Sequence, residues 1–405
     1  MRYSFLLSCF LLAAVLGPVA HAAIDKARLL RTLDSVDRTA ELDAELKSLP
    51  KGTPSKDKQA LQHALQDEKK RMQRIRQQVG QCADAVAKSG NINAKSPQNG
   101  LTLLMAVAES GSEEAVRMVL AENPDMMVIT KKGKTALQME RENGGNVLTG
   151  VLTERWVDAV ENNKMDEVVA LLDIGFPAST SVNGNPPLGI AIKTGNKELF
   201  NQLSFNNPVV TDVMKDGTSL PELAIRANDA DALLFLLQSG ADATEPFSDG
   251  DDPLRFVLCH AKPECARAFI VGAKLPNEQE GTTLACMAVR YGSPEMVRRV
   301  LPIFSDAAAE DSFGNNPLLE AARRGRVDVL TAVREVCPSC AAENKQGETA
   351  LMHAALSGKT EMVDAVRKAY PNLKPGKKDK KGRTAEDFAR MIPNNPAQAA
   401  LKAAQ

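Results

Sequence analysis

The chain has few of the residues that usually carry catalytic chemistry or fill large cores. Aromatic residues make up 4% of its 405 residues, there is a single tryptophan, Trp156, and there are four histidines. Neither a G-x-S-x-G nor an H-E-x-x-H motif occurs, so these serine-hydrolase and zinc-protease signatures are absent. Alanine, leucine and valine dominate, which suits many small helix–helix contacts. The sequence therefore predicts a non-enzymatic protein without a cofactor or a metal.

An excess of charge of one sign is also missing. The chain has 50 Lys and Arg residues against 51 Asp and Glu residues, a formal net charge of −1. Such a balance gives no global reason to seek nucleic acid or an anionic membrane. Beyond the N-terminal region, charged residues, glycine or proline interrupt every apolar stretch. We therefore expect neither nucleic-acid binding nor membrane insertion.

The one long apolar run lies at the N-terminus. Residues 5–16 are mostly apolar and lie between Arg2 and Gly17. A pattern of small residues follows and ends at Ala22. This arrangement is typical of a secretory signal peptide with cleavage after Ala22, and the run is too short to span a bilayer. The sequence predicts an exported protein, periplasmic or secreted.

A glycine recurs with a period close to 33 residues. Five of the eight intervals between its occurrences are 33 residues long, and the longest, 51 residues, contains a further helical unit at residues 156–175. The glycines are Gly100, Gly133, Gly184, Gly217, Gly250, Gly281, Gly314, Gly347 and Gly382. A fixed period in this range is the sequence signature of a repeat architecture.

The residues after each glycine repeat as well. Gly314 opens the segment G-N-N-P-L-L-E-A-A-R-R-G, and Gly347 opens G-E-T-A-L-M-H-A-A-L-S-G. Both segments resemble the ankyrin repeat, whose pattern is G-x-T-P-L-H-x-A-A-x-x-G, and the resemblance covers roughly residues 90–392. It implies an all-α solenoid of stacked helix-turn-helix units with short hairpin loops, and a role in binding a protein partner.

Each part of the repeat has a physical reason. Threonine or asparagine two residues after the leading glycine predicts a helix N-cap, and Pro187, Pro253 and Pro317 fall in the first helical turn, where a missing N–H is harmless. A second glycine, such as Gly292 or Gly325, is predicted to end the first helix in a left-handed turn. One unit cannot bury its own apolar stripe, so these residues are expected to hold the stack together.

We predict five segments. The second ankyrin unit, which begins at Gly133, lacks the Ala-Ala pair, so we expect a break near residues 140–155. A helix cap is expected near Thr53, before a charged helical stretch whose polar outer face would keep the stack soluble. The segments are a signal peptide at 1–22, a helical N-terminal cap at 23–95, first ankyrin units at 96–155, a main array at 156–392 and a C-terminal tail at 393–405.

Six cysteines remain after cleavage, and an oxidising compartment favours disulfides. Cys337 and Cys340 have the spacing of a thioredoxin-type pair, but they follow a second helix and lack the βαβ context of a redox centre. We interpret them as a structural disulfide. Cys259 and Cys265 flank a short turn and are candidates for a second, local bridge, with Cys286 as the competing partner.

The charges at the hairpin tips change along the chain. Equivalent positions of neighbouring units line up in space, so the acidic middle tips predict a strip that attracts a basic patch on a partner. The assigned partner-binding residues are Asp249, Asp251, Asp252, Glu278, Glu280, Asp311 and Phe313. The last hairpin is basic and contains Lys377, Lys378, Lys380, Lys381 and Arg383.

Together these features predict a protein–protein interaction module in the periplasm. We expect a chain that is monomeric by itself and binds one protein partner on the concave ankyrin face, as an adaptor or an immunity-type inhibitor. One alternative is a secreted effector that engages host proteins. Another is a periplasmic thiol-active protein that uses Cys337 and Cys340.

Overall fold

The structure is a computed structural model that describes residues 24–273, 275, 278–279, 282–304 and 306–402. The expected cleavage position after Ala22 lies outside these residues, and so does Glu280. The chain forms two compact units: unit 1 ends at Pro177, and unit 2 begins at Ala178.

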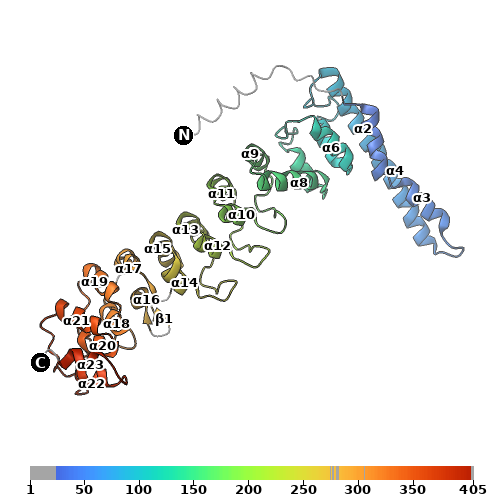
Figure 1. Ribbon diagram of the computed structural model, residues 1–405. Coiled ribbons are helices and arrows are strands. Elements are labelled where there is room, and N and C mark those ends of the chain that lie inside the picture. The colour runs from blue at the N-terminus through green and yellow to red at the C-terminus, as the bar shows by residue number, and fades with distance from the viewer. Residues whose placement is uncertain (1–23, 274, 276–277, 280–281, 305, 403–405) are drawn as a thin grey trace. The chain divides into compact units, whose positions relative to one another are not determined.

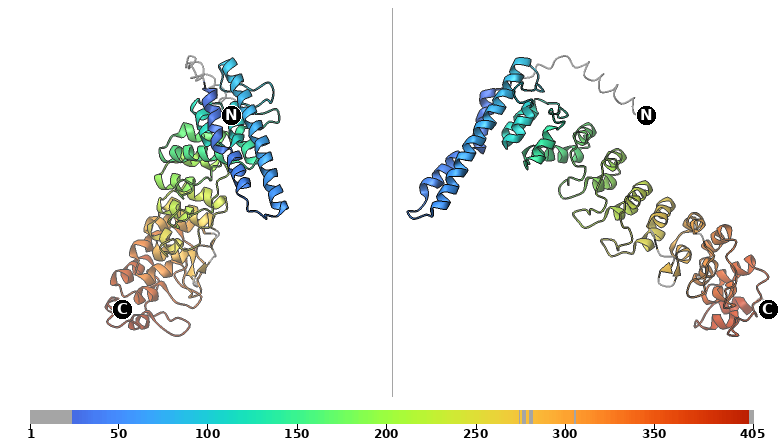
Figure 2. Two further views of the ribbon diagram at one scale, coloured as in Figure 1. Left: turned by 90° about the vertical axis from the view of Figure 1, so that its right-hand side faces the viewer. Right: turned by 180° about the vertical axis from the view of Figure 1, so that it is seen from behind.

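Unit 1 is a helical cap followed by helix pairs. The long helix α4 is flanked by α2 and α3 and packs on α5 (Figure 2). Its apolar residues Leu65, Met72, Ile75 and Val79, at helical spacing, are buried. The helices are α2 (Lys26–Thr32), η1 (Leu33–Val36), α3 (Thr39–Ser48), α4 (Ser55–Ser89), α5 (Leu103–Ser110), α6 (Glu113–Ala121), α7 (Ala136–Glu142), α8 (Val147–Glu161) and α9 (Met165–Asp173).

The atypical second ankyrin unit is completed by a buried carboxylate. Glu140 stands where the repeat pattern has its first alanine, and it is 2% exposed. Its carboxylate accepts hydrogen bonds from the N–H groups of Leu148 and Thr149, at 2.5 and 2.8 Å, and from the Thr149 hydroxyl. Asn146, the N-cap residue of α8, makes no side-chain cap. Glu140 therefore supplies the acceptors that the first turn of α8 needs.

Unit 2 is a stack of helix pairs in two rows (Figure 1). The first-helix row consists of α10 (Pro187–Thr194), α12 (Leu220–Arg226), α14 (Pro253–His260), α16 (Leu284–Tyr291), α18 (Pro317–Arg324), α20 (Ala350–Leu356) and α22 (Ala385–Arg390). The second-helix row consists of α11 (Lys197–Ser204), α13 (Ala230–Gln238), α15 (Pro263–Gly272), α17 (Pro294–Val300) with η2 (Leu301–Ile303), α19 (Val327–Val336), α21 (Thr360–Ala369) and α23 (Ala397–Lys402).

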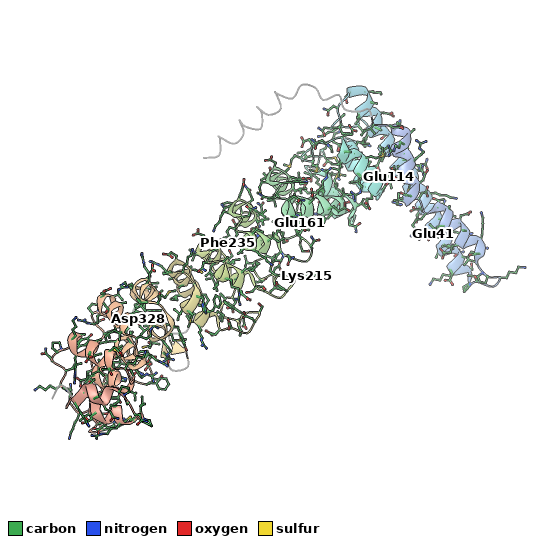
Figure 3. The ribbon with its side chains drawn as sticks, viewed as in Figure 1. Glu41, Glu114, Glu161, Lys215, Phe235 and Asp328 are labelled. Atoms are coloured by element: carbon green, nitrogen blue, oxygen red, sulfur yellow. A yellow bond between two sulfur atoms is a disulfide. The ribbon has the colours of Figure 1, made fainter. Side chains whose placement is uncertain are left out.

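Hairpin loops join each pair to the next. Lys215 lies on the loop before α12, whereas Phe235 lies on α13 of the second row (Figure 3). The N–H of Lys215 donates to Asn185 Oδ1 of the preceding loop at 3.0 Å, so adjacent loops are tied together. One loop forms a short antiparallel pair, β1 (Glu278–Gln279) with β2 (Thr282–Thr283).

Most of the expected helix caps are present, with two corrections. The cap predicted near Thr53 is not formed, because Pro54 precedes α4 without a side-chain cap and the Thr53 hydroxyl donates to the carbonyl of Pro50. Thr349 and Asn316, two residues after their leading glycines, cap α20 and α18 through their side-chain oxygens. Gly325 ends α18 in the left-handed conformation, at φ 64°. The left-handed prediction for Gly292 was wrong, since its φ is −78°. A Cβ there would lie 2.5 Å from the carbonyl oxygen of Ala288. The close approach of this carbonyl, and not the φ angle, therefore requires glycine at this position.

The stack continues to the end of the described chain. Residues 393–402, expected to form a tail, include α23, which packs on α20, α21 and α22. Ala397 and Leu401 of α23 are buried. Helix pairs with capped first helices, joined by hairpins and stacked in two rows, make the fold an all-α ankyrin-type solenoid.

Candidate partner-binding surface

Three of the acidic residues predicted to bind a partner share the hairpin before α14. The N–H of Phe247 donates to the carbonyl of Asp251 at 2.9 Å and closes the hairpin. Asp249 Oδ1 accepts the N–H of Asp251, and Asp252 Oδ1 accepts the N–H of Arg255 at 2.7 Å, which caps α14. Asp249, Asp251 and Asp252 are all exposed at this tip.

Arg226 of α12 connects this tip to the preceding ankyrin repeat. Its Nε lies 2.9 Å from Glu222 Oε1, and its Nη2 lies 2.5 Å from Asp249 Oδ2. Glu222 is 2% exposed and also accepts the N–H and the hydroxyl of Ser248, both at 2.9 Å. The N–H of Asp251, followed by the Arg226 guanidinium, holds the pKa of Asp249 below its usual value. The charge of Asp249 is thus paired inside the molecule.

Aromatic rings line the same corner. The ring centroid of Phe256 lies 5.2 Å from that of Phe247 and 5.0 Å from that of His260. The Arg226 guanidinium carbon lies 4.9 Å from the Phe256 centroid, within the range of a cation–π contact. The rings therefore form a preordered apolar wall at the base of the hairpin.

A cavity of about 430 Å³ opens between the tip and this wall. Its lining includes Asp251, Asp252, Arg255, Phe256, Cys259 and His260. The Arg255 guanidinium carbon lies 5.4 Å from the ring centroid of Tyr291 in the next unit. The cavity thus combines two carboxylates with aromatic surface, groups that both attract a cationic side chain.

The other predicted acidic residues are placed differently. The backbone of Glu278 pairs with Thr283 in the β1–β2 ladder. Asp311 is 6% exposed, and its Oδ1 accepts the N–H groups of Phe313 and Asn315 at 3.0 and 2.8 Å. Asp311 therefore holds its own hairpin and does not add an exposed charge to the acidic tips. Phe313, in contrast, is 64% exposed.

The predicted basic hairpin is partly paired within the fold. Lys377 forms an ion pair with Glu343. Arg383 Nη2 lies 2.6 Å from Asp379 Oδ2 and 2.8 Å from Glu348 Oε1. The exposed basic residues that remain are Lys378, Lys380 and Lys381.

Sequence reasoning missed a buried charge cluster in the first-helix row. Glu320 is fully buried, and its carboxylate lies 2.7 Å from Arg290 Nε, 2.9 Å from Arg324 Nε and 3.1 Å from Arg323 Nε. Burial raises the pKa of Glu320, but the hydrogen bonds and charges of the arginines outweigh it and leave the pKa below its usual value. The i+3 and i+4 spacing of Arg323 and Arg324 was a visible signal. Arg290 comes from α16, in the neighbouring ankyrin repeat of the same unit.

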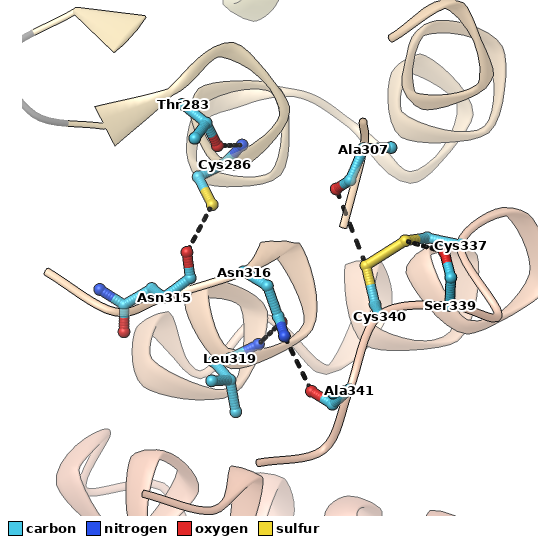
Figure 4. Close-up of a disulfide and its surroundings, with 10 residues drawn as sticks. All are labelled: Thr283, Cys286, Ala307, Asn315, Asn316, Leu319, Cys337, Ser339, Cys340 and Ala341. Carbon is cyan, nitrogen blue, oxygen red and sulfur yellow. Dashed lines mark hydrogen bonds between the residues drawn. A yellow bond between two sulfur atoms is a disulfide. The ribbon is translucent and has the colours of Figure 1, made fainter. Parts of the chain in front are cut away.

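The cysteines form one of the two expected bridges. Cys337 and Cys340 are joined by a disulfide, with their Cα atoms 5.4 Å apart (Figure 4). They are 3% and 7% exposed, and thiol–disulfide exchange needs access to a sulfur, so this burial disfavours a thiol-active centre. The Cys259–Cys265 bridge is not formed, because Cys259 lies on the exposed surface whereas Cys265 is buried in the core.

Neither a metal-binding cluster nor a membrane-spanning helix occurs in the described part of the chain. No group of three His, Cys, Asp or Glu side chains in the described parts could hold a metal ion. No helix among the described residues has both the length and the apolar character to cross a membrane.

Of the comparisons with known proteins, only the comparison with solved structures finds chains similar to this one. No protein-family model and no curated protein sequence matches it. The solved ankyrin-repeat domain of Bcl-3, a member of the IkappaB protein family, is similar over 54% of this chain and 99% of its own, with 20% identity and a TM-score of 0.40. The human ASB11 ankyrin-repeat domain is similar over 55% of this chain and 98% of its own, with 20% identity and a TM-score of 0.39. The fold assignment rests on the repeat geometry of the chain itself.

Proposed function

We propose that this chain is a non-enzymatic protein-binding scaffold that holds a basic segment of a partner at the hairpin before α14. The observation that carries the proposal is the cavity in which Asp251 and Asp252 stand beside Phe256 and His260. Carboxylates attract the charge of a lysine or arginine, and an aromatic wall attracts the same group through its ring faces. The Arg255 guanidinium also lines the cavity, but it lies 5.4 Å from the ring centroid of Tyr291, so a cation–π contact holds its charge against that ring.

The proposed setting is the periplasm, with the chain acting as an adaptor or an immunity-type inhibitor. The apolar N-terminal run and the small residues that end at Ala22 support export. A disulfide such as Cys337–Cys340 persists in an oxidising compartment, which fits this location. Fractionation of cells that express the full chain tests it. Recovery of the processed protein from culture supernatant, and not from the periplasm, would favour the secreted-effector alternative.

The binding proposal is tested with the double variant Asp251→Asn/Asp252→Asn. Asparagine at position 252 can still cap α14, so the variant removes charge and keeps the helix start. Partners are captured on the immobilised chain, residues 23–405, from cross-linked periplasmic extract, and the cross-linked segment is identified by mass spectrometry. We expect a partner bound through a lysine- or arginine-rich segment, with affinity reduced about tenfold or more in the variant.

The matched control is Asp231→Asn/Glu264→Gln, which removes two negative charges from the exposed second-helix row, on α13 and α15. Both variants change the net charge of the chain by the same amount. Equal loss of binding in the two variants would mean that overall charge, and not this cavity, attracts the partner. Unchanged binding in Asp251→Asn/Asp252→Asn would refute the assignment of the site.

A further inference from the structure

A second exposed surface, in unit 1, has the opposite charge. The loop between α6 and α7 carries Met127, which is 52% exposed, and Ile129, which is 48% exposed. Within residues 24–177 these are the two large hydrophobic side chains that are exposed. Lys131 and Lys132 lie at the tip of the same loop, with one residue between Ile129 and Lys131. Apolar and cationic side chains are therefore presented together.

Hydrogen bonds fix the shape of this tip. The N–H of Thr130 donates to the carbonyl of Lys134 at 2.8 Å, and the N–H of Gly133 donates back to Thr130 at 3.0 Å. Lys131 lies along the preceding hairpin, where a Cβ on Gly100 would be 3.7 Å from its Cε. The tip is thus an ordered hairpin, and the position of Lys131 is set by its neighbour.

A cavity of about 390 Å³ lies between the two hairpins and α7. Leu101 and Met139 give it apolar surface, and Lys131, Lys132 and Lys134 give it positive charge. Lys134 is paired with Glu142, which also lines the cavity. Lys131 and Lys132 are exposed and have no ion-pair partner in the described part of the chain. The cavity therefore carries an uncompensated positive charge beside apolar surface.

We propose that this surface binds an acidic polypeptide segment that carries aliphatic side chains. Carboxylates of the segment pair with Lys131 and Lys132, while its aliphatic groups cover Met127 and Ile129 and enter the cavity. A nucleic acid fits less well, because no aromatic ring or arginine lines the cavity for base stacking, and Glu142 would face the phosphates. This surface lies in a different unit from the proposed site before α14 and has the opposite charge. Failure of one proposal therefore does not affect the other.

The probes are four labelled ligands: a short peptide of glutamate and leucine, the same peptide with lysine for glutamate, the same peptide with serine for leucine, and oligo(dT). Binding to the chain of residues 23–405 is followed by fluorescence anisotropy at physiological salt. We expect the glutamate–leucine peptide to bind most tightly, and Lys131→Glu/Lys132→Glu to weaken it by about tenfold or more. Met127→Ser/Ile129→Ser should weaken the same peptide and leave the serine peptide unaffected.

The control is Lys56→Glu/Lys58→Glu, which reverses two exposed lysines on α4 and should bind the peptide as the unaltered chain does. The fluorescence of Trp156, buried in unit 1, reports whether each variant is folded. Three results would overturn the proposal: no binding of the glutamate–leucine peptide, equal weakening by the α4 control, or tighter binding of oligo(dT) or the serine peptide.

Discussion

Replacing Glu320 with glutamine removes the one negative charge that three arginines share in the core of unit 2. Breaking a buried, hydrogen-bonded ion pair by altering one partner costs about 3–5 kcal/mol. The lower end applies, because the Arg323 and Arg324 side chains are 34% and 42% exposed and can turn toward water. Arg290, at 17% exposed, cannot do so as easily. We expect Glu320→Gln to lower the free energy of unfolding by about 3 kcal/mol.

The assay is urea denaturation followed by two probes. Trp156 is the single tryptophan and lies in unit 1, so its fluorescence follows that unit, whereas far-UV circular dichroism follows the helices of both units. A loss of about 3 kcal/mol, with a slope of about 2–3 kcal/mol per M urea, moves the unit 2 transition by about 1 M.

The matched control is Glu335→Gln, which neutralises an exposed carboxylate 2.6 Å from Arg298 Nε. Exposed ion pairs contribute little, so its unfolding transition should coincide with that of the unaltered chain. If Glu320→Gln and Glu335→Gln have the same urea midpoint, the buried cluster does not stabilise unit 2 and the reasoning fails.

The same cluster predicts a pH dependence. The pKa of Glu320 in the folded state lies below its ordinary value of 4.5, so the unfolded chain binds this proton more readily. The contribution of Glu320 is therefore complete above pH 4.5 and is lost as the pH falls through the lower, folded-state pKa. The difference in stability between the unaltered chain and Glu320→Gln should shrink below pH 4.5, and a constant difference would contradict the assignment.

Gly189→Ala should destabilise unit 2 by about 1–3 kcal/mol, since a Cβ would lie 2.5 Å from Met214 Sδ; an unchanged thermal transition by circular dichroism would contradict this packing. Gly150→Ala, at an open position within α8, should instead stabilise unit 1 by about 0.5–1 kcal/mol, measured by tryptophan fluorescence. A maleimide should label Cys259 quickly in the folded chain, and rapid labelling of further described thiols would contradict their burial. Burial raises the pKa of the protected thiols to about 11 for Cys82 and Cys265 and about 12 for Cys286.

The features that the sequence predicted correctly depend on contacts within one repeat. The glycine period marked the repeats, Thr349 and Asn316 were expected to cap their helices, and Pro317 was expected in a first turn. The Cys337–Cys340 bridge was also foreseen, because it joins residues three positions apart. Such features follow from spacing along the chain, so one sequence contains enough information to identify them.

The candidate sites were only partly foreseen from sequence. The acidic hairpin before α14 was identified, but residue type did not distinguish the exposed Asp251 from Asp311, which turns inward to hold its own backbone. The aromatic wall behind Asp251 was not anticipated. Phe256 and His260 look like ordinary helix residues until the fold brings Arg226 of the preceding unit over the Phe256 ring.

By itself, then, the sequence determined the repeat unit, its helix starts and most of its turns, since these rest on interactions a few residues long. Only the tertiary structure decided which charges are paired and which face solvent. Arg290 meets Glu320 across the boundary between two ankyrin repeats, and Arg226 meets Asp249 across another. The physical reason is that burial and electrostatic pairing depend on distances between neighbouring repeats. The spacing of residues along the sequence does not contain those distances.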